Sequence, residues 1–139
     1  MIILDTNVVS EILRPAPAPQ VLTWMSMQSG TDLYLTTITE AELRHGVALL
    51  PAGRRRKALT QLIDEILERD FLGRVLPFDR VAAQAYAMIA AKRRTAGRPI
   101  AQMDCQIAAI ARCHDFAVAT RNTDDFANCG ITVIDPWRL

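Results

Sequence analysis

Short apolar runs alternate with amphipathic stretches along the chain. Each apolar run spans only a few residues and ends at a polar residue, which is typical of buried strands. The expected strands are 2–4, 33–38, 75–78, 117–120 and 131–134. Because Pro77 cannot donate a hydrogen bond to a neighbouring strand, the third strand is expected at the edge of a sheet.

The stretches between these runs repeat apolar residues with the helical period. Positions 59–67 follow the i, i+3, i+4, i+7, i+8 spacing of an amphipathic helix, and positions 81–89 and, more weakly, 21–25 repeat it. The segment 100–114 is rich in Ala, Ile and Cys, which indicates a largely buried helix. Strands that alternate with helices predict an α/β protein with a parallel sheet covered on both faces. We expect one domain over residues 1–139.

Composition narrows the classes of function. The formal net charge is +1, so any contact with nucleic acid requires a local basic patch rather than bulk charge. No apolar run approaches the ~18 residues of a membrane span, and Met1–Asp5 lacks a basic leader, so we expect a cytoplasmic protein with no membrane contact. The cysteines are three in number and form no CxxC, which argues against a disulfide framework or a zinc site.

Acidic residues follow the first two expected strands. Asp5, with Thr6 and Asn7, comes directly after the first strand and could cap the helix expected near Val8. Glu42 follows the second strand and could close a capping box with Thr39. Since ligand sites of open α/β sheets form beyond the carboxyl ends of the strands, both acids are expected on the same rim.

Three further acids lie in the second half of the chain. Asp104 lies on an apolar helix with no basic residue at i±3 or i±4, so it requires a long-range ion pair or a bound cation. Asp124 and Asp125 follow the fourth strand, where capping of a short turn is the simpler role. Carboxylates that converge on one rim repel each other, and oxygen ligands of this kind suit Mg²⁺ or Mn²⁺. The sequence therefore predicts metal-dependent phosphodiester or phosphoryl chemistry.

Four motifs, in order along the chain, resemble the PIN-domain ribonucleases, and within them the VapC-type toxins. They are Ile3–Asn7, Ile38–Gly46, Met103-Asp104 and Ala119–Asn122 with Asp124 and Phe126, accompanied by Leu76–Asp79 and Pro136-Trp137. The resemblance implies an αβα sandwich with a five-stranded parallel sheet. It also implies a Mg²⁺- or Mn²⁺-dependent endoribonuclease, a homodimer, and a cognate antitoxin protein as partner.

The resemblance assigns roles position by position. Asp5, Glu42 and Asp104 match the metal-binding and catalytic acids of the family. The fourth acidic position of the family's pattern falls on Asn122, which leaves the number of metal ions open, and Asp124 is the nearby acid that could substitute. The remaining expected pocket residues are Thr6, Asn7 and Thr120. The implied reaction is hydrolysis of an RNA phosphodiester by a metal-activated water.

Basic residues offer contacts to the RNA backbone. Arg44 and Arg121 are expected near the acidic rim and are candidates for binding substrate phosphate. The run Arg54–Lys57 opens a helix, where cations oppose the helix dipole. We expect this run to be a solvated face balanced by the acids at 64, 65 and 68, with RNA contact as the alternative.

Two other functions remain open at this point. A phosphatase of the haloacid-dehalogenase type also places Asp after its first strand, but it needs a second Asp where this chain has Asn7. A non-catalytic PIN-like module that binds a metal ion or an antitoxin is the second alternative. The sequence does not identify the RNA target or the bond cleaved.

Overall fold

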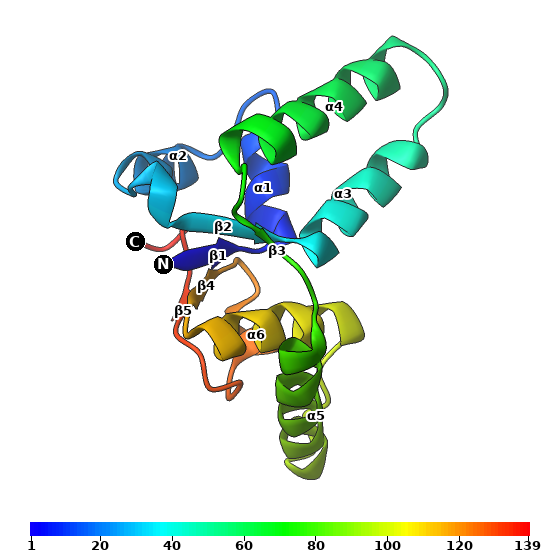
Figure 1. The fold of residues 1–139 in the computed structure, drawn as a ribbon. Coiled ribbons are helices and arrows are strands. Elements are labelled where there is room, and N and C mark those ends of the chain that lie inside the picture. Colours follow the sequence, from blue (N-terminus) through cyan, green and yellow to red (C-terminus); the bar gives the residue numbers. More distant parts are fainter.

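The structure, a computed structural model, describes residues 1–139 and forms three layers (Figure 1). Five parallel strands lie in the order β3-β2-β1-β4-β5. Helices α1–α4 cover one face of this sheet, and α5 and α6 cover the other. The predicted αβα sandwich with a five-stranded parallel sheet is therefore confirmed.

The strands are short and the helices carry most of the chain. The strands are β1 (Ile2–Leu4), β2 (Leu33–Thr36), β3 (Val75–Leu76), β4 (Ala117–Ala119) and β5 (Val133–Ile134). The helices are α1 (Thr6–Ile12), α2 (Pro19–Ser26), α3 (Thr37–Ala48), α4 (Arg54–Glu65), α5 (Arg80–Thr95) and α6 (Gln102–His114). Short 3₁₀ turns span Gly30–Asp32 and Thr123–Phe126, and a π-helical turn, Ile66–Asp70, follows α4.

All five expected strands are present, each within its apolar run. β3 is an edge strand that ends before Pro77, as that residue's missing N–H requires. β2 ends at Thr36 rather than at position 38, because Thr36 caps α3. The helix after β1 begins at Thr6, two residues earlier than expected at Val8, because Asp5 accepts a hydrogen bond from the Thr6 amide and caps it directly.

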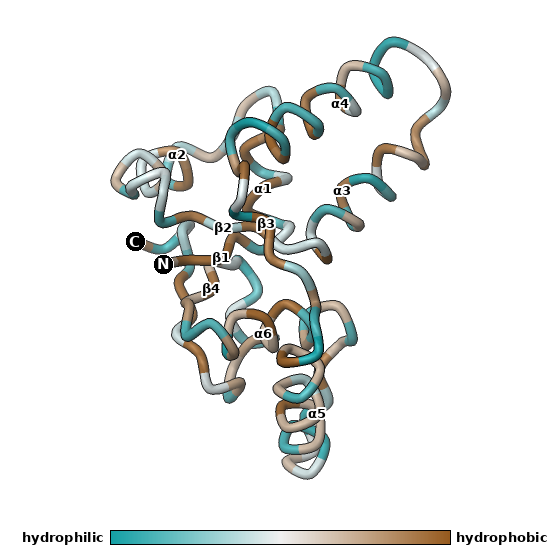
Figure 2. Tube along the Cα trace, viewed as in Figure 1, coloured by the Kyte–Doolittle hydropathy of each residue, from teal (hydrophilic) through white to brown (hydrophobic).

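Successive strand residues point to opposite faces of the sheet. Ile3 and Val118 lie in the apolar cluster under α5 and α6, whereas Leu4 and Ala119 lie in the cluster under α1–α4. All four are at most 1% exposed, so the strands are apolar on both faces. Figure 2 shows this as brown strands at the centre, while the start of α4 is teal. None of the helices combines the length and apolar character needed to cross a membrane.

Arg93, near the end of α5, is buried rather than solvated at the helix end. Its guanidinium donates to the carbonyl oxygens of Arg98 (2.6 Å), Asp125 (2.9 Å) and Ala127 (2.8 Å). The last two carbonyls belong to the loop after β4, so Arg93 fixes that loop against α5. Removing such a buried cation destabilises the folded protein mainly because the carbonyl oxygens it served are left without a hydrogen-bond donor.

We expect Arg93→Met to lower the free energy of unfolding by about 2–3 kcal/mol, because three carbonyl oxygens lose a charged donor. Urea unfolding followed by circular dichroism measures this change. The matched control is Arg94→Met on the exposed side of the same helix, which should change stability by less than about 0.5 kcal/mol. Equal effects of the two substitutions would contradict a structural role of Arg93.

Candidate active site

An acidic pocket of about 420 Å³ lies at the carboxyl edge of the sheet. Its walls come from α1 and the residues around it, from the N-terminal halves of α3 and α6, and from the segments after β4 and β5. The lining residues are Asp5, Thr6, Asn7, Ser10, Glu11, Arg14, Glu42, Asp104, Arg121, Asn122 and Trp137. The three acids expected to converge, Asp5, Glu42 and Asp104, therefore line one pocket although they are far apart in the sequence.

Asp5 is both the cap of α1 and part of the pocket. Its Oδ1 accepts from the Thr6 amide at 2.8 Å. Its Oδ2 accepts from the Thr120 hydroxyl at 2.8 Å and from the Asn7 side-chain amide at 3.2 Å. With only 4% exposure, the Asp5 carboxylate is fixed in one orientation by donors from two strand ends.

Glu42 is oriented by a hydroxyl rather than by helix capping. The expected capping box is wrong, because Thr36 is the cap of α3 and its hydroxyl accepts from the Thr39 amide at 3.1 Å. Glu42 lies a full turn further along α3, and its Oε1 accepts from the Thr6 hydroxyl at 2.8 Å. The Thr6 hydroxyl also lies 3.0 Å from the Thr39 hydroxyl. The Glu42 carboxylate is thus directed towards the pocket from α3.

Asp104 has no partner in the protein. It lies in the first turn of α6, half-buried, and no hydrogen bond or ion pair of the structure includes its carboxylate. Burial and then the charges of Asp5, Asp125 and Glu42 raise its pKa to about 6. The expected alternative of a long-range salt bridge is therefore wrong for Asp104.

The charge of Asp5 is also unfavourable in the folded protein. Burial raises the pKa of Asp5, and the charges of Glu42 and Asp125 raise it further, which outweighs the lowering by the Thr120 and Thr6 hydrogen bonds. The five ion pairs of the structure include none of Asp5, Glu42 or Asp104. The pocket is thus an unneutralised cluster of carboxylates, which a cation would stabilise.

Thr120, Asn7 and Asn122 form the frame behind the acids. The Thr120 hydroxyl, fully buried, accepts from the Asn7 side-chain amide at 3.2 Å and from the Asn122 backbone amide at 3.0 Å while it donates to Asp5. The side-chain Oδ1 of Asn7 accepts a hydrogen bond from the Arg121 backbone amide at 3.2 Å. These bonds connect α1 with the segment after β4.

Two expected site residues lie elsewhere. Asp124, in the 3₁₀ turn Thr123–Phe126, is exposed and does not line the pocket. Its neighbour Asp125 does not line the pocket either, but the charge of Asp125 is among those that raise the pKa of Asp5 and of Asp104. Arg44 binds Glu40 at 2.9 Å on its own helix and an acid of α4 at 2.9 Å, so it faces α4 rather than the acidic pocket.

Four pocket residues were not expected from the sequence. Ser10 lies one turn after Thr6 on α1, so helical spacing could have indicated it. Glu11 and Arg14 pair with each other at 3.1 Å further along the same segment. Trp137 comes from the segment after β5, and no local pattern brings it to the pocket.

The donors of the pocket are chemically suited to a hard divalent cation. They are carboxylate, hydroxyl and amide oxygens, with no thiol or imidazole among them. No three Asp, Glu, His or Cys side chains approach closely enough to enclose an ion by themselves. Hard divalent cations can retain several waters and bind through one or two carboxylates. The side chains that face the pocket as candidate ligands are Asp5, Asp104 and Glu42.

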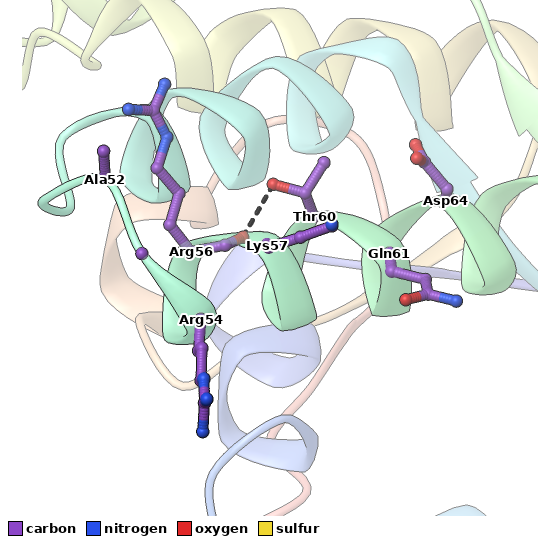
Figure 3. Close-up of a pocket in the computed structure, with 8 residues that line it drawn as sticks. Ala52, Arg54, Arg56, Lys57, Thr60, Gln61 and Asp64 are labelled. Atoms are coloured by element: carbon purple, nitrogen blue, oxygen red, sulfur yellow. Dashed lines mark hydrogen bonds between the residues drawn. The ribbon is translucent and has the colours of Figure 1, made fainter.

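A second hollow, of about 800 Å³, lies along α4 and contains no acid cluster (Figure 3). Arg54, Arg56 and Lys57 line it. None of the basic run Arg54–Lys57 forms an ion pair, and Asp64, one of the acids expected to balance the run, lines the same hollow while it binds Arg44. The run is therefore a solvated cationic surface outside the acidic pocket.

Fold and pocket together define a three-layer α/β protein with a carboxylate site at the carboxyl edge of its sheet. Residues 2–131 match the PIN domain family. The chain is 44% identical over 137 residues to the VapC ribonuclease Y4jK of Sinorhizobium fredii, which covers 99% of this chain and 98% of the relative. It is also 44% identical over 137 residues to Toxin FitB of Neisseria gonorrhoeae, with 99% of each chain covered.

The solved structures agree with this assignment. The crystal structure of FitAcB from Neisseria gonorrhoeae superposes with a TM-score of 0.95 and 45% sequence identity over 100% of both chains. The chain belongs to the PIN-domain family, and the expected similarity to its VapC-type toxins is confirmed.

The raised pKa of Asp104 predicts how metal-free stability varies with pH. Because the folded protein favours the protonated carboxyl, this stabilising contribution is present below the ordinary pKa near 3.8 and is lost as pH rises through about 6. We expect metal-free Asp104→Asn to unfold a few degrees above the unsubstituted protein at about pH 7.5, and the difference to shrink towards about pH 5. Thermal unfolding in EDTA at both pH values measures it. A lower unfolding temperature of Asp104→Asn at about pH 7.5 would contradict the crowding of charge.

Proposed function

We propose that this protein is a Mg²⁺- or Mn²⁺-dependent endoribonuclease, the toxin of a VapBC-type toxin–antitoxin pair. PIN-domain nucleases generally use a divalent metal ion. The observation that carries the proposal is the convergence of Asp5, Glu42 and Asp104 in one pocket, where none of the three forms an ion pair. The substrate is RNA, and the proposal places the activity in a single domain over residues 1–139.

Each acid has a separate task in the proposed reaction. Asp5 and Asp104 hold the cation, and Glu42 ligates it or orients its water. When bound, the cation lowers the pKa of a water and stabilises the charge that develops on the phosphate. Thr120 and Asn7 hold Oδ2 of the Asp5 carboxylate, the Thr6 backbone amide holds Oδ1, and the Thr6 hydroxyl holds Glu42. These fixed orientations favour one position of the phosphate relative to the water.

The partners follow from the relatives. Since relatives of this chain are a VapC ribonuclease and Toxin FitB, we propose a cognate antitoxin protein that inhibits the nuclease, and a homodimer as the assembled form. A cytoplasmic location accords with an RNA target and with the absence of a membrane-crossing helix.

The two alternatives fare differently. Membership of the PIN-domain family does not support the haloacid-dehalogenase phosphatase, and Asn7 takes a structural role by donating to Asp5 and Thr120. A non-catalytic module that binds metal or antitoxin would share the fold and the pocket. Only a measurement of RNA cleavage distinguishes this binding module from the nuclease.

We expect purified protein to cleave RNA in Mg²⁺ or Mn²⁺ and EDTA to stop the reaction. Asp104→Asn should lower the cleavage rate at least about a hundredfold, because it removes a charge that holds the cation. The matched control is Asp32→Asn, an exposed acid remote from the pocket, which should cleave normally. Full activity of Asp104→Asn would exclude the proposed site, and an inert unsubstituted protein would favour the binding module.

We also expect Thr6→Val to weaken Mn²⁺ binding roughly 10–100-fold, because the donor that holds Glu42 is lost at nearly constant side-chain volume. Isothermal titration calorimetry with MnCl₂ measures the dissociation constant independently of activity. Thr6→Ser, which keeps the hydroxyl, should bind nearly as the unsubstituted protein does. Unchanged binding by Thr6→Val would show that Glu42 needs no positioning.

A further inference from the structure

Arg121 is a cation at the acidic pocket that binds no acid. Its backbone amide is fixed by the Asn7 side chain at 3.2 Å, while its side chain is exposed and forms no ion pair or hydrogen bond. The other cation of the pocket, Arg14, instead pairs with Glu11 at 3.1 Å. Arg121 pairs with none of the carboxylates beside it, and its guanidinium makes a different contact.

That contact is the ring of Trp137. The guanidinium carbon of Arg121 lies over this ring, 5.2 Å from its centroid. Trp137 itself is half-buried against the apolar cluster under α1–α4, and its backbone amide donates to the Asp135 carboxylate at 2.9 Å. A ring fixed in this way supports a flat guanidinium by cation–π attraction and stacking.

We propose that the Arg121 guanidinium, supported by Trp137, is a stacking surface for an unpaired nucleobase of the RNA beside the cleaved phosphate. The proposal rests on the ribonuclease function above and adds which side chains receive a base next to the acids. Arg121 contacts the base. Trp137 is a positioning residue that holds the planar guanidinium over its ring and away from the carboxylates.

Three features support this arrangement. A guanidinium plane and an unstacked base present matching flat faces, and RNA-binding proteins recognise single strands in this way. Bases within a duplex are already stacked and cannot reach such a surface. The pocket volume of about 420 Å³ lies within the roughly 300–1,000 Å³ of cavities that hold small ligands, so one nucleotide can enter beside the acids.

The test measures RNA binding by Asp104→Asn protein, which keeps the pocket but should not cleave. The probes are a short single-stranded RNA containing 2-aminopurine and the duplex of the same sequence, in buffer with Mg²⁺. We expect Asp104→Asn to bind the single strand at least about tenfold more tightly than the duplex. Binding should also quench the 2-aminopurine fluorescence, because quenching reports stacking of the base.

Two substitutions of Arg121 in this background separate charge from stacking. Arg121→Ala should weaken single-strand binding about tenfold and abolish the quenching. Arg121→Lys keeps the charge but not the plane, so it should retain duplex binding and lose both the preference for the single strand and the quenching. Single-strand affinity and quenching unchanged in Arg121→Lys would overturn the proposal.

Substitutions of Trp137 test the positioning role. Trp137→Phe keeps a ring and should keep the quenching, whereas Trp137→Leu should behave as Arg121→Lys does. Thermal unfolding shows whether each variant is folded. If Trp137→Leu is unfolded, the results for Arg121→Lys and Trp137→Phe alone decide whether the proposal holds. If quenching depends on Arg121 but the unsubstituted protein cleaves no RNA in Mg²⁺ or Mn²⁺, the stacking surface is supported and only the nuclease function is refuted.

Discussion

Repulsion between carboxylates at the carboxyl edge of the sheet is the constraint on which the site depends. Asp5 and Asp104 have raised pKa values because they are removed from water and lie near further acids, with Glu42 among them. No ion pair relieves this repulsion. The folded chain therefore bears an energetic cost at this edge, and the binding of a divalent cation would remove it. The same arrangement that weakens the metal-free protein gives the pocket its affinity for metal.

Such a site persists only if the surrounding structure fixes each acid independently. Asp5 is fixed because it caps α1 and accepts from Thr120, a fully buried hydroxyl. Glu42 is fixed by the Thr6 hydroxyl, which in turn lies against Thr39. These hydroxyls belong to strand ends and first helical turns, so the elements that build the sheet also orient the acids. Stability and pocket geometry thus depend on the same few hydrogen bonds.

The sequence predicts those features that depend on local pattern. Five apolar runs give the five strands, and Asp104 is a candidate because no base lies within helical reach of it. Glu42 is correctly placed at the rim of the pocket, but the capping box from which it was predicted is wrong. Thr36 and Thr39 are both plausible caps of α3 by sequence, and only the backbone conformation shows that Thr36 is the cap. The choice between Asp124 and Asp125 depends on the rotation of one 3₁₀ turn. Trp137 depends on long-range packing, which single-sequence periodicity does not contain.

The cations near the pocket explain why its charge survives. Arg14 pairs with Glu11 on its own segment, and Arg44 bridges α3 and α4. Arg93 donates its hydrogen bonds to backbone carbonyl oxygens. Each of these contacts satisfies an arginine with acceptors outside the three-acid cluster. Arg121 would be the exception, and Trp137 holds it over a ring instead. A chain with nearly equal numbers of acidic and basic residues thereby keeps three acids of one pocket without an ion pair, although Arg14 and Arg121 line the same pocket.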